Sequence, residues 1–184
     1  MPASFKKCRN LLAGVGQLQP DDFQCVSEDR FHTDSQTVDQ TAATLGIEFP
    51  AGYREFIARF GEGLLAGKIR VFPPYQILEG DLGIDAWRGR IKEYWFWDTA
   101  ESVLPQTRAL ECVLIADTTD GDELVFHPDQ PNRIYVLPRY DETSYIAGDG
   151  LWPAIQWLLT SGVLFDEVED HSSQPFDGQA AQSS

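Results

Sequence analysis

The stretch of this sequence with the most chemical potential is DTTDGDE, residues 117–123. It places the carboxylates of Asp117, Asp120, Asp122 and Glu123 within seven positions and has a glycine among them. Carboxylates at this density can hold a metal ion, share a proton as acid and base, attract a basic partner, or stay solvated at a turn. Each of these roles requires a different arrangement of the surrounding residues.

A calcium loop is the first arrangement that the residues exclude. An EF-hand loop needs oxygen ligands at positions 1, 3 and 5, glycine at 6 and glutamate at 12. With Gly121 at position 6, Ala116 falls at position 1 and His127 at position 12, so the first and last ligands are missing. The sequence therefore predicts no metal site here.

Acid–base catalysis by paired carboxylates requires burial or a neighbour that separates their pKa values. We expect the four acids to lie at a solvated loop tip, where such a separation is difficult to maintain. A carboxylate-dependent hydrolase is therefore the least favoured of three functional hypotheses. It requires at least two of these acids to converge in a cleft.

Other catalytic templates are also missing from the sequence. There is no G-x-S-x-G, no G-x-x-x-x-G-K-[ST] and no H-E-x-x-H. The three histidines and three cysteines lie far apart, without C-x-x-C spacing, so we predict no zinc site, no cofactor and no catalytic residues. A cysteine nucleophile would need a histidine nearby in space, which sequence spacing does not reveal.

A β-hairpin accounts for every residue type in 117–123. The Asp-Gly step favours positive φ, and it lies between CVLIA (112–116) and ELVFH (123–127), both rich in strand-forming residues. Further strands are predicted at 68–72, 91–97, 133–137 and 144–147. Short strands in quick succession indicate an antiparallel meander rather than βαβ units.

Helices are predicted before and after this meander in the sequence. One begins at Asp34 or Ser35 and ends before Gly46. A second follows Pro50 and carries an aromatic stripe within AGYREFIARF, and a third is capped by Asp149 and ends before Gly162. We expect residues 75–90 to form a loop or a short helical turn.

The composition indicates an acidic soluble protein. The chain has 184 residues and a net charge of −15, so nucleic acid and anionic membranes, which carry the same sign, are poor partners. No apolar run approaches the roughly 18 residues of a membrane span and no signal peptide is evident, so we expect a cytoplasmic protein whose natural complement is a basic protein.

Three regions are expected along the chain. Residues 1–35 form an N-terminal extension that could pack on the domain, and residues 36–165 form the domain itself. Residues 166–184 form a disordered acidic tail, because they contain acids, no Lys or Arg, and few apolar residues.

Three blocks of the sequence resemble the SMI1/KNR4 family of the SUKH superfamily. These are IEFPAGYREFIARFGEG (47–63), LIADTTDGDELVFHPDQPNRIYVLPRYDE (114–142) and GLWPAIQWLL (150–159), in the family's order and spacing. The resemblance implies an α+β fold in which helices pack on a curved antiparallel sheet. It also implies a non-enzymatic domain, because no catalytic residues belong to the family pattern.

The resemblance implies protein binding, since many bacterial members are immunity proteins that neutralise a cognate toxin. A basic toxin, such as a nuclease, would be steered to an acidic inhibitor. The alternative is a regulatory adaptor or scaffold without a toxin partner. The partner-binding candidates are the acids of the hairpin tip and residues expected at another exposed edge of the sheet: Asp117, Asp120, Asp122, Glu123, Asp81, Asp85, Glu93, Trp95 and Trp97. For the two tryptophans, burial in the core and exposure at an interface are equally open.

Overall fold

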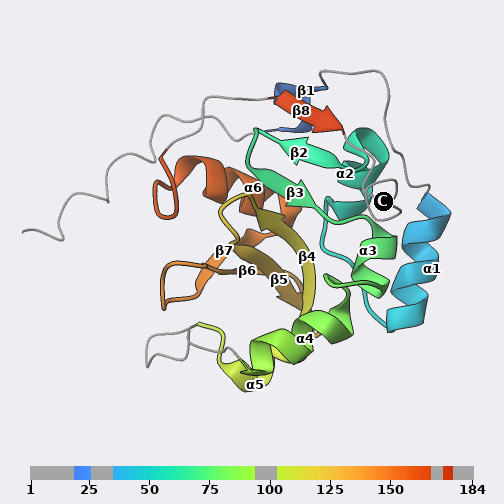
Figure 1. Cartoon of the computed structure of the whole chain (residues 1–184). Helices are drawn as coiled ribbons and strands as arrows, with labels where there is room; N and C mark the ends of the chain where they lie inside the picture. Colours follow the sequence, from blue (N-terminus) through green and yellow to red (C-terminus); the bar gives the residue numbers. More distant parts are fainter. Residues whose placement is uncertain (1–18, 26–34, 94–102, 167–171, 176–184) are drawn as a thin grey trace, which may run out of the picture.

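The structure is a computed structural model that describes residues 19–25, 35–93, 103–166 and 172–175. It contains an eight-stranded sheet in the order β1-β8-β2-β3-β4-β5-β6-β7, with helices packed against it (Figure 1). Every neighbouring pair of strands is antiparallel except β1 and β8, which run parallel. The predicted α+β fold is confirmed, and the parallel outer pair is an addition to it.

The middle and one edge of the sheet form the predicted meander. Its strands are β2 (Gly63–Leu65), β3 (Ile69–Val71), β4 (Val113–Thr118), β5 (Glu123–His127), β6 (Gln130–Leu137) and β7 (Tyr145–Asp149). The five predicted strands that lie within this set are confirmed, apart from small shifts at their ends. The short strand β2 was not predicted, because it has only three residues and begins with a glycine.

The helices are α1 (Ser35–Leu45), α2 (Tyr53–Phe60), α3 (Pro74–Leu78), α4 (Ile84–Glu93), α5 (Gln106–Ala109) and α6 (Leu151–Thr160). The aromatic stripe of α2 is core, because Tyr53, Phe56, Ile57 and Phe60 are all buried. The helix α2 ends at Phe60, so the predicted stop at Gly61 is confirmed. Gly61 has a φ of 65°, which glycine adopts without strain.

One contiguous hydrophobic core lies between the sheet and the helices. The side chain of Trp152 on α6 contacts the rings of Phe56 and Phe60 at centroid distances of 5.6 and 5.9 Å. It also contacts Phe23 at 5.8 Å, and Phe23 is only 2% exposed. The N-terminal segment 19–25 therefore contributes a buried aromatic ring to this core.

Two predictions about residues 75–97 differ from the structure. A loop or a short helical turn was predicted for 75–90, and the five-residue α3 agrees with a short turn, but the ten-residue α4 is a full helix. The strand predicted from Ile91 is contradicted for 91–93, which end α4. The buried residues of α4 are Ile84, Trp87 and Ile91, at the i, i+3, i+7 spacing of a helix face. Trp95 and Trp97 lie outside the described residues.

The expectation of a disordered tail is wrong for Ser172–Pro175. These residues form β8, which lies between β1 (Gln24–Cys25) and β2 and so brings segments from the two ends of the chain side by side (Figure 1). Backbone pairing requires no apolar side chain, which is why the polar composition concealed this strand.

The start of α6 also differs from the prediction. Its N-cap is Gly150, with a φ of 111°, and no side chain caps the helix. Asp149 instead ends β7, and its carboxylate lies 3.3 Å from Nε of Arg133. No helix within the described part of the chain has the length and apolar character needed to cross a bilayer.

Candidate interaction site

The turn between β4 and β5 has the predicted hairpin geometry. Gly121 adopts a φ of 92°, which a residue with a side chain would adopt only with strain. The Arg139 side chain lies against this glycine, since a Cβ built on Gly121 would be 2.7 Å from Cδ of Arg139. The turn therefore packs directly on the residues that follow β6.

Asp122 is buried beneath this turn rather than solvated. It is 4% exposed, and its Oδ2 accepts a hydrogen bond from the Thr118 hydroxyl at 2.7 Å. Its Oδ1 accepts a hydrogen bond from the backbone N–H of Arg139 at 3.0 Å. Both carboxylate oxygens are thus occupied in holding two connections of the sheet together.

Asp117 is occupied by a neighbouring cation. It lies directly opposite Arg70 of β3, and the two side chains form a two-pronged ion pair in which Arg70 Nε donates to Oδ1 at 2.9 Å. Burial raises the pKa of the Asp117 carboxyl above its ordinary value, and this effect exceeds the opposing influence of Arg70. The pair lines a shallow pocket of 410 Å³ together with Leu64, Thr118 and Thr119.

Glu123 continues this row of charges onto β5. It lies opposite Asp117, and its carboxylate accepts hydrogen bonds from Trp87 Nε1 at 2.8 Å and from Arg90 Nη2 at 2.9 Å. Both donors come from α4. Glu123 therefore fixes α4 against the sheet, and the otherwise buried indole N–H of Trp87 obtains an acceptor.

Asp120 is the most exposed carboxylate of the four, with 46% of its side chain accessible. It forms an ion pair with Lys68 Nζ at 3.1 Å, and that ammonium also lies 5.5 Å from the centre of the Phe165 ring. The expectation of a solvated acidic tip is therefore wrong for Asp117, Asp122 and Glu123. It is correct only for Asp120.

The other acidic candidates lie on or beside α4, not at an edge of the sheet. Asp81 precedes the helix, Asp85 is in its first turn and Glu93 is its last residue, and all three are exposed. The expectation of a second sheet edge here is wrong because the segment is helical. Arg90 connects this region to the hairpin, because it donates to the Asp81 carbonyl at 3.3 Å and to the Glu123 carboxylate at 2.9 Å.

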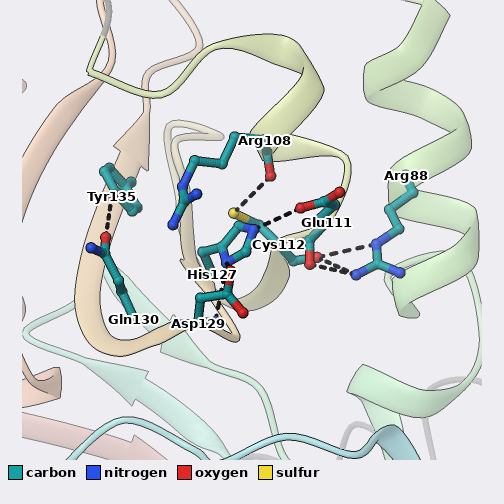
Figure 2. A network of polar contacts seen from close by, with 8 residues as sticks. All are labelled: Arg88, Arg108, Glu111, Cys112, His127, Asp129, Gln130 and Tyr135. Carbon is teal, nitrogen blue, oxygen red and sulfur yellow. Dashed lines mark hydrogen bonds and ion pairs between the residues drawn. The ribbon is translucent and has the colours of Figure 1, made fainter.

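One cluster does bring a cysteine, a histidine and an acid together. Figure 2 shows Cys112, His127 and Glu111 near the junction of α5 and β4. Nε2 of His127 lies 2.9 Å from Glu111 Oε2, and Nδ1 accepts a hydrogen bond from the backbone N–H of Asp129 at 3.1 Å. Since Nδ1 is an acceptor, the ring proton is on Nε2.

The chemistry of this cluster is that of a structural joint. The Cys112 sulfur is fully buried, its S–H donates to the carbonyl of Arg108 at 3.5 Å, and burial raises the pKa of the thiol to about 12. A thiol with that pKa remains protonated at neutral pH and is a poor nucleophile. Arg88 of α4 adds donors to the carbonyls of Glu111 and Cys112, so the cluster joins α4, α5 and β4 (Figure 2).

Sequence reasoning missed an exposed aromatic residue in the connection that follows β6. Tyr140 is 84% exposed, and the guanidinium of Arg139 lies 5.8 Å from the centre of its ring. The signal available in the sequence was an aromatic residue directly after Pro138 and Arg139, which follow the end of β6 at Leu137. Within the described ranges, no group of three or more His, Cys, Asp or Glu side chains is placed to hold a metal ion.

Comparison with known protein families agrees with this fold. The model of the SMI1/KNR4 family (SUKH-1) matches residues 32–149, which include α1 to α5 and all of β2 to β7. The chain belongs to the SMI1/KNR4 family. A search of curated proteins finds no significant match to the chain.

Membership of the SUKH-1 family places the chain among domains that are generally non-enzymatic and of the immunity type. The matched segment contains every described residue that was singled out from the sequence: the hairpin acids and the acids around α4. It excludes both partners of the β1–β8 pair, so the edge of the sheet beyond β2 is built by residues outside the family match.

Proposed function

We propose that this protein is a non-enzymatic binding domain, an immunity protein that neutralises a cognate toxin by covering it. The observation that carries the proposal is the state of the four hairpin carboxylates. Each already has a partner within the protein: Arg70, Lys68, Trp87 with Arg90, or Thr118 with the Arg139 backbone. Carboxylates engaged in this way stabilise a surface rather than exchange protons with a substrate.

The hydrolase hypothesis loses its support from the same contacts. It required at least two hairpin acids to converge in a cleft with separated pKa values. Asp117 does have a raised pKa and does line a pocket, but its neighbour there is Arg70. The carboxylate opposite it, Glu123, is directed to Trp87 and Arg90 of α4.

The net charge of −15 supports a basic partner. Because the hairpin acids are balanced locally by Lys68, Arg70 and Arg90, the charge available for long-range attraction lies elsewhere, including Asp81, Asp85 and Glu93 around α4. Such a field raises the rate of encounter with a basic protein and weakens as salt is added. We assign these exposed acids around α4 to steering, and Asp117, Asp122 and Glu123 to holding the hairpin rigid.

The test is co-expression with the product of the neighbouring gene. If that product arrests growth when expressed alone, we expect this chain to restore growth and to form an isolable complex whose association rate falls steeply with ionic strength. A stable complex without restored growth would favour the adaptor alternative. If the two proteins form no complex and growth is not restored, the assignment as an immunity protein is overturned.

A further inference from the structure

A groove lies between α1 and the segment that enters α2, and these two helices contact each other in the fold. Its volume is 370 Å³, and its apolar lining includes Val38 and Ala42 of α1 with Ile47 and Phe49 of the connecting segment. That volume is within the range of pockets that accept a ligand or a large side chain. The groove is separate from the hairpin site.

An ion pair joins the two walls of the groove. The Arg54 guanidinium on α2 binds the Asp39 carboxylate on α1, and Nη1 of the same Arg54 donates to the carbonyl of Ser35 at 3.1 Å. The contact with Arg54 lowers the pKa of the Asp39 carboxyl below its ordinary value. Asp39 and Arg54 therefore neutralise each other and hold α1 at a fixed position beside α2.

Two further acids line the groove and have no such partner. Glu48 and Glu55 are both exposed, and no ion pair is formed by either within the part of the chain that the structure describes. With Asp39 and Arg54 cancelling, the groove has an apolar floor and a rim that carries net negative charge. This combination is complementary to an apolar side chain flanked by Lys or Arg.

We propose that this groove is the docking site for a basic segment of the protein partner, which inserts one large apolar side chain over Val38 and Ala42. This inference rests on the proposed function and specifies the chemistry that the partner must present. Lys or Arg on either side of the inserted residue pairs with Glu48 and Glu55. The buried apolar anchor supplies most of the affinity, and the rim charges set orientation and rate.

A second copy of this chain is the less suitable occupant. Two copies would bring together rims of the same negative sign on proteins that each carry a net charge of −15, which opposes association. A basic segment carries the opposite charge and is therefore attracted to the acidic rim. Charge complementarity therefore selects a basic partner over self-association.

The probe for this proposal is a 14-residue synthetic peptide of Leu and Lys with its leucines at helical i, i+3, i+4, i+7 spacing. It is titrated into the full-length isotope-labelled chain at low ionic strength, and amide shifts are followed by NMR. We expect saturable shifts concentrated on α1 and residues 47–55. Absence of binding, or shifts concentrated elsewhere, would overturn the proposal.

Matched variants separate docking in the groove from general attraction to an acidic protein. Ala42→Phe fills the floor, and Ala43→Phe adds the same ring on the exposed side of α1. Glu48→Lys with Glu55→Lys changes the rim, and Glu79→Lys with Asp85→Lys makes the same change in net charge beside α4. We expect the groove variants to weaken peptide binding about tenfold, which corresponds to about 1.4 kcal/mol.

The control variants are expected to weaken binding by no more than about twofold, which is the scale of a screened long-range effect. Equal losses in groove and control variants would show that only the total charge matters and would overturn the docking site. Because the titration contains no toxin, its outcome is independent of growth rescue. Peptide docking without growth rescue would reject the immunity function and retain the docking site. Growth rescue without peptide docking would reject the docking site and retain the immunity function.

Discussion

The buried carboxylate of Asp122 accepts the backbone N–H of Arg139 at 3.0 Å and so connects the β4–β5 turn to the connection that follows β6. Through this contact an acid that looks like surface charge in the sequence becomes a structural element. The same side chain binds Thr118 within the turn, so one carboxylate fixes both the shape of the turn and its position.

Replacing Asp122 with alanine should therefore destabilise the fold. The change leaves the Arg139 N–H and the Thr118 hydroxyl without their acceptor, and we expect a loss of about 2 kcal/mol in the free energy of unfolding. Urea unfolding measures it. The matched control is Asp120→Ala in the same turn, an exposed ion pair whose removal should change stability by less than about 0.5 kcal/mol. Equal effects from the two variants would contradict the structural role of Asp122.

The Arg70–Asp117 pair predicts an unusual dependence of stability on pH. Burial raises the pKa of Asp117 in the folded protein, so the folded state holds this proton more tightly than the unfolded chain does. The stability contributed by that proton is complete below the unfolded pKa of about 3.9 and is lost as the pH rises through the folded pKa. Asp117→Asn mimics the protonated form and removes this dependence.

We expect the wild type to lose stability relative to Asp117→Asn as the pH rises from 4 towards neutrality. Urea unfolding of both proteins at a series of pH values, at low protein concentration because the pI is about 4.4, gives the difference directly. Asp120→Asn provides the comparison for an exposed carboxylate. If the wild type instead gained stability relative to Asp117→Asn with rising pH, the ion pair with Arg70 would outweigh burial. The conclusion that the pKa of Asp117 is raised in the folded protein would then be wrong.

The sequence predicted well those elements that depend on neighbouring residues in the chain, and predicted poorly those that depend on contacts between distant residues. The strand Glu123–His127 was predicted to the residue, because strand-forming residues follow directly on a turn signal. The helix α2 was predicted because four aromatic and aliphatic residues share one face. In α4 the same kind of pattern was present at Ile84, Trp87 and Ile91, but the aromatic residues that follow Glu93 favoured a strand over 91–97.

The candidate site was less predictable, because its character depends on contacts between distant segments. The acceptor role of Asp122 requires Arg139, 17 residues further along the chain, and the pairing of Asp117 with Arg70 spans 47 residues. Neither contact follows from composition or periodicity, since both depend on strand order and register. A cluster of acids in a sequence therefore predicts a turn well and predicts a free surface charge poorly.

Cys112 offers a test of the buried cluster beside His127. Burial raises the pKa of its thiol to about 12, so we expect it to resist alkylation by iodoacetamide at pH 8 in the folded protein. The experiment uses the Cys8→Ser, Cys25→Ser double variant, in which Cys112 is the only thiol. Mass spectrometry should detect alkylation only after denaturant is added. Rapid alkylation of the folded protein would contradict the buried, protonated thiol and would reopen a nucleophilic role beside His127.

The strand β8 can be tested at Gly63, where β2 approaches it too closely for a side chain. A Cβ on Gly63 would lie 2.6 Å from the carbonyl oxygen of Gln174 and 3.0 Å from Cα of Pro175, and both are backbone atoms that cannot simply rotate away. We expect Gly63→Ala to separate β8 from β2 and to cost about 1–3 kcal/mol. Hydrogen exchange at the Ala66 amide, which donates to the Ser172 carbonyl at 2.7 Å, should become faster.

The matched control is Gly89→Ala, within α4, where an added Cβ has no atom within 4 Å. Alanine is the better helix former, so this variant should gain about 0.5–1 kcal/mol and leave exchange at Ala66 unchanged. If Gly63→Ala were as stable as the wild type and Ala66 remained protected, β8 would not occupy the position between β1 and β2. The outer edge of the sheet would then end at β2, and the segment around Ser172 would contribute nothing to the stability of the domain.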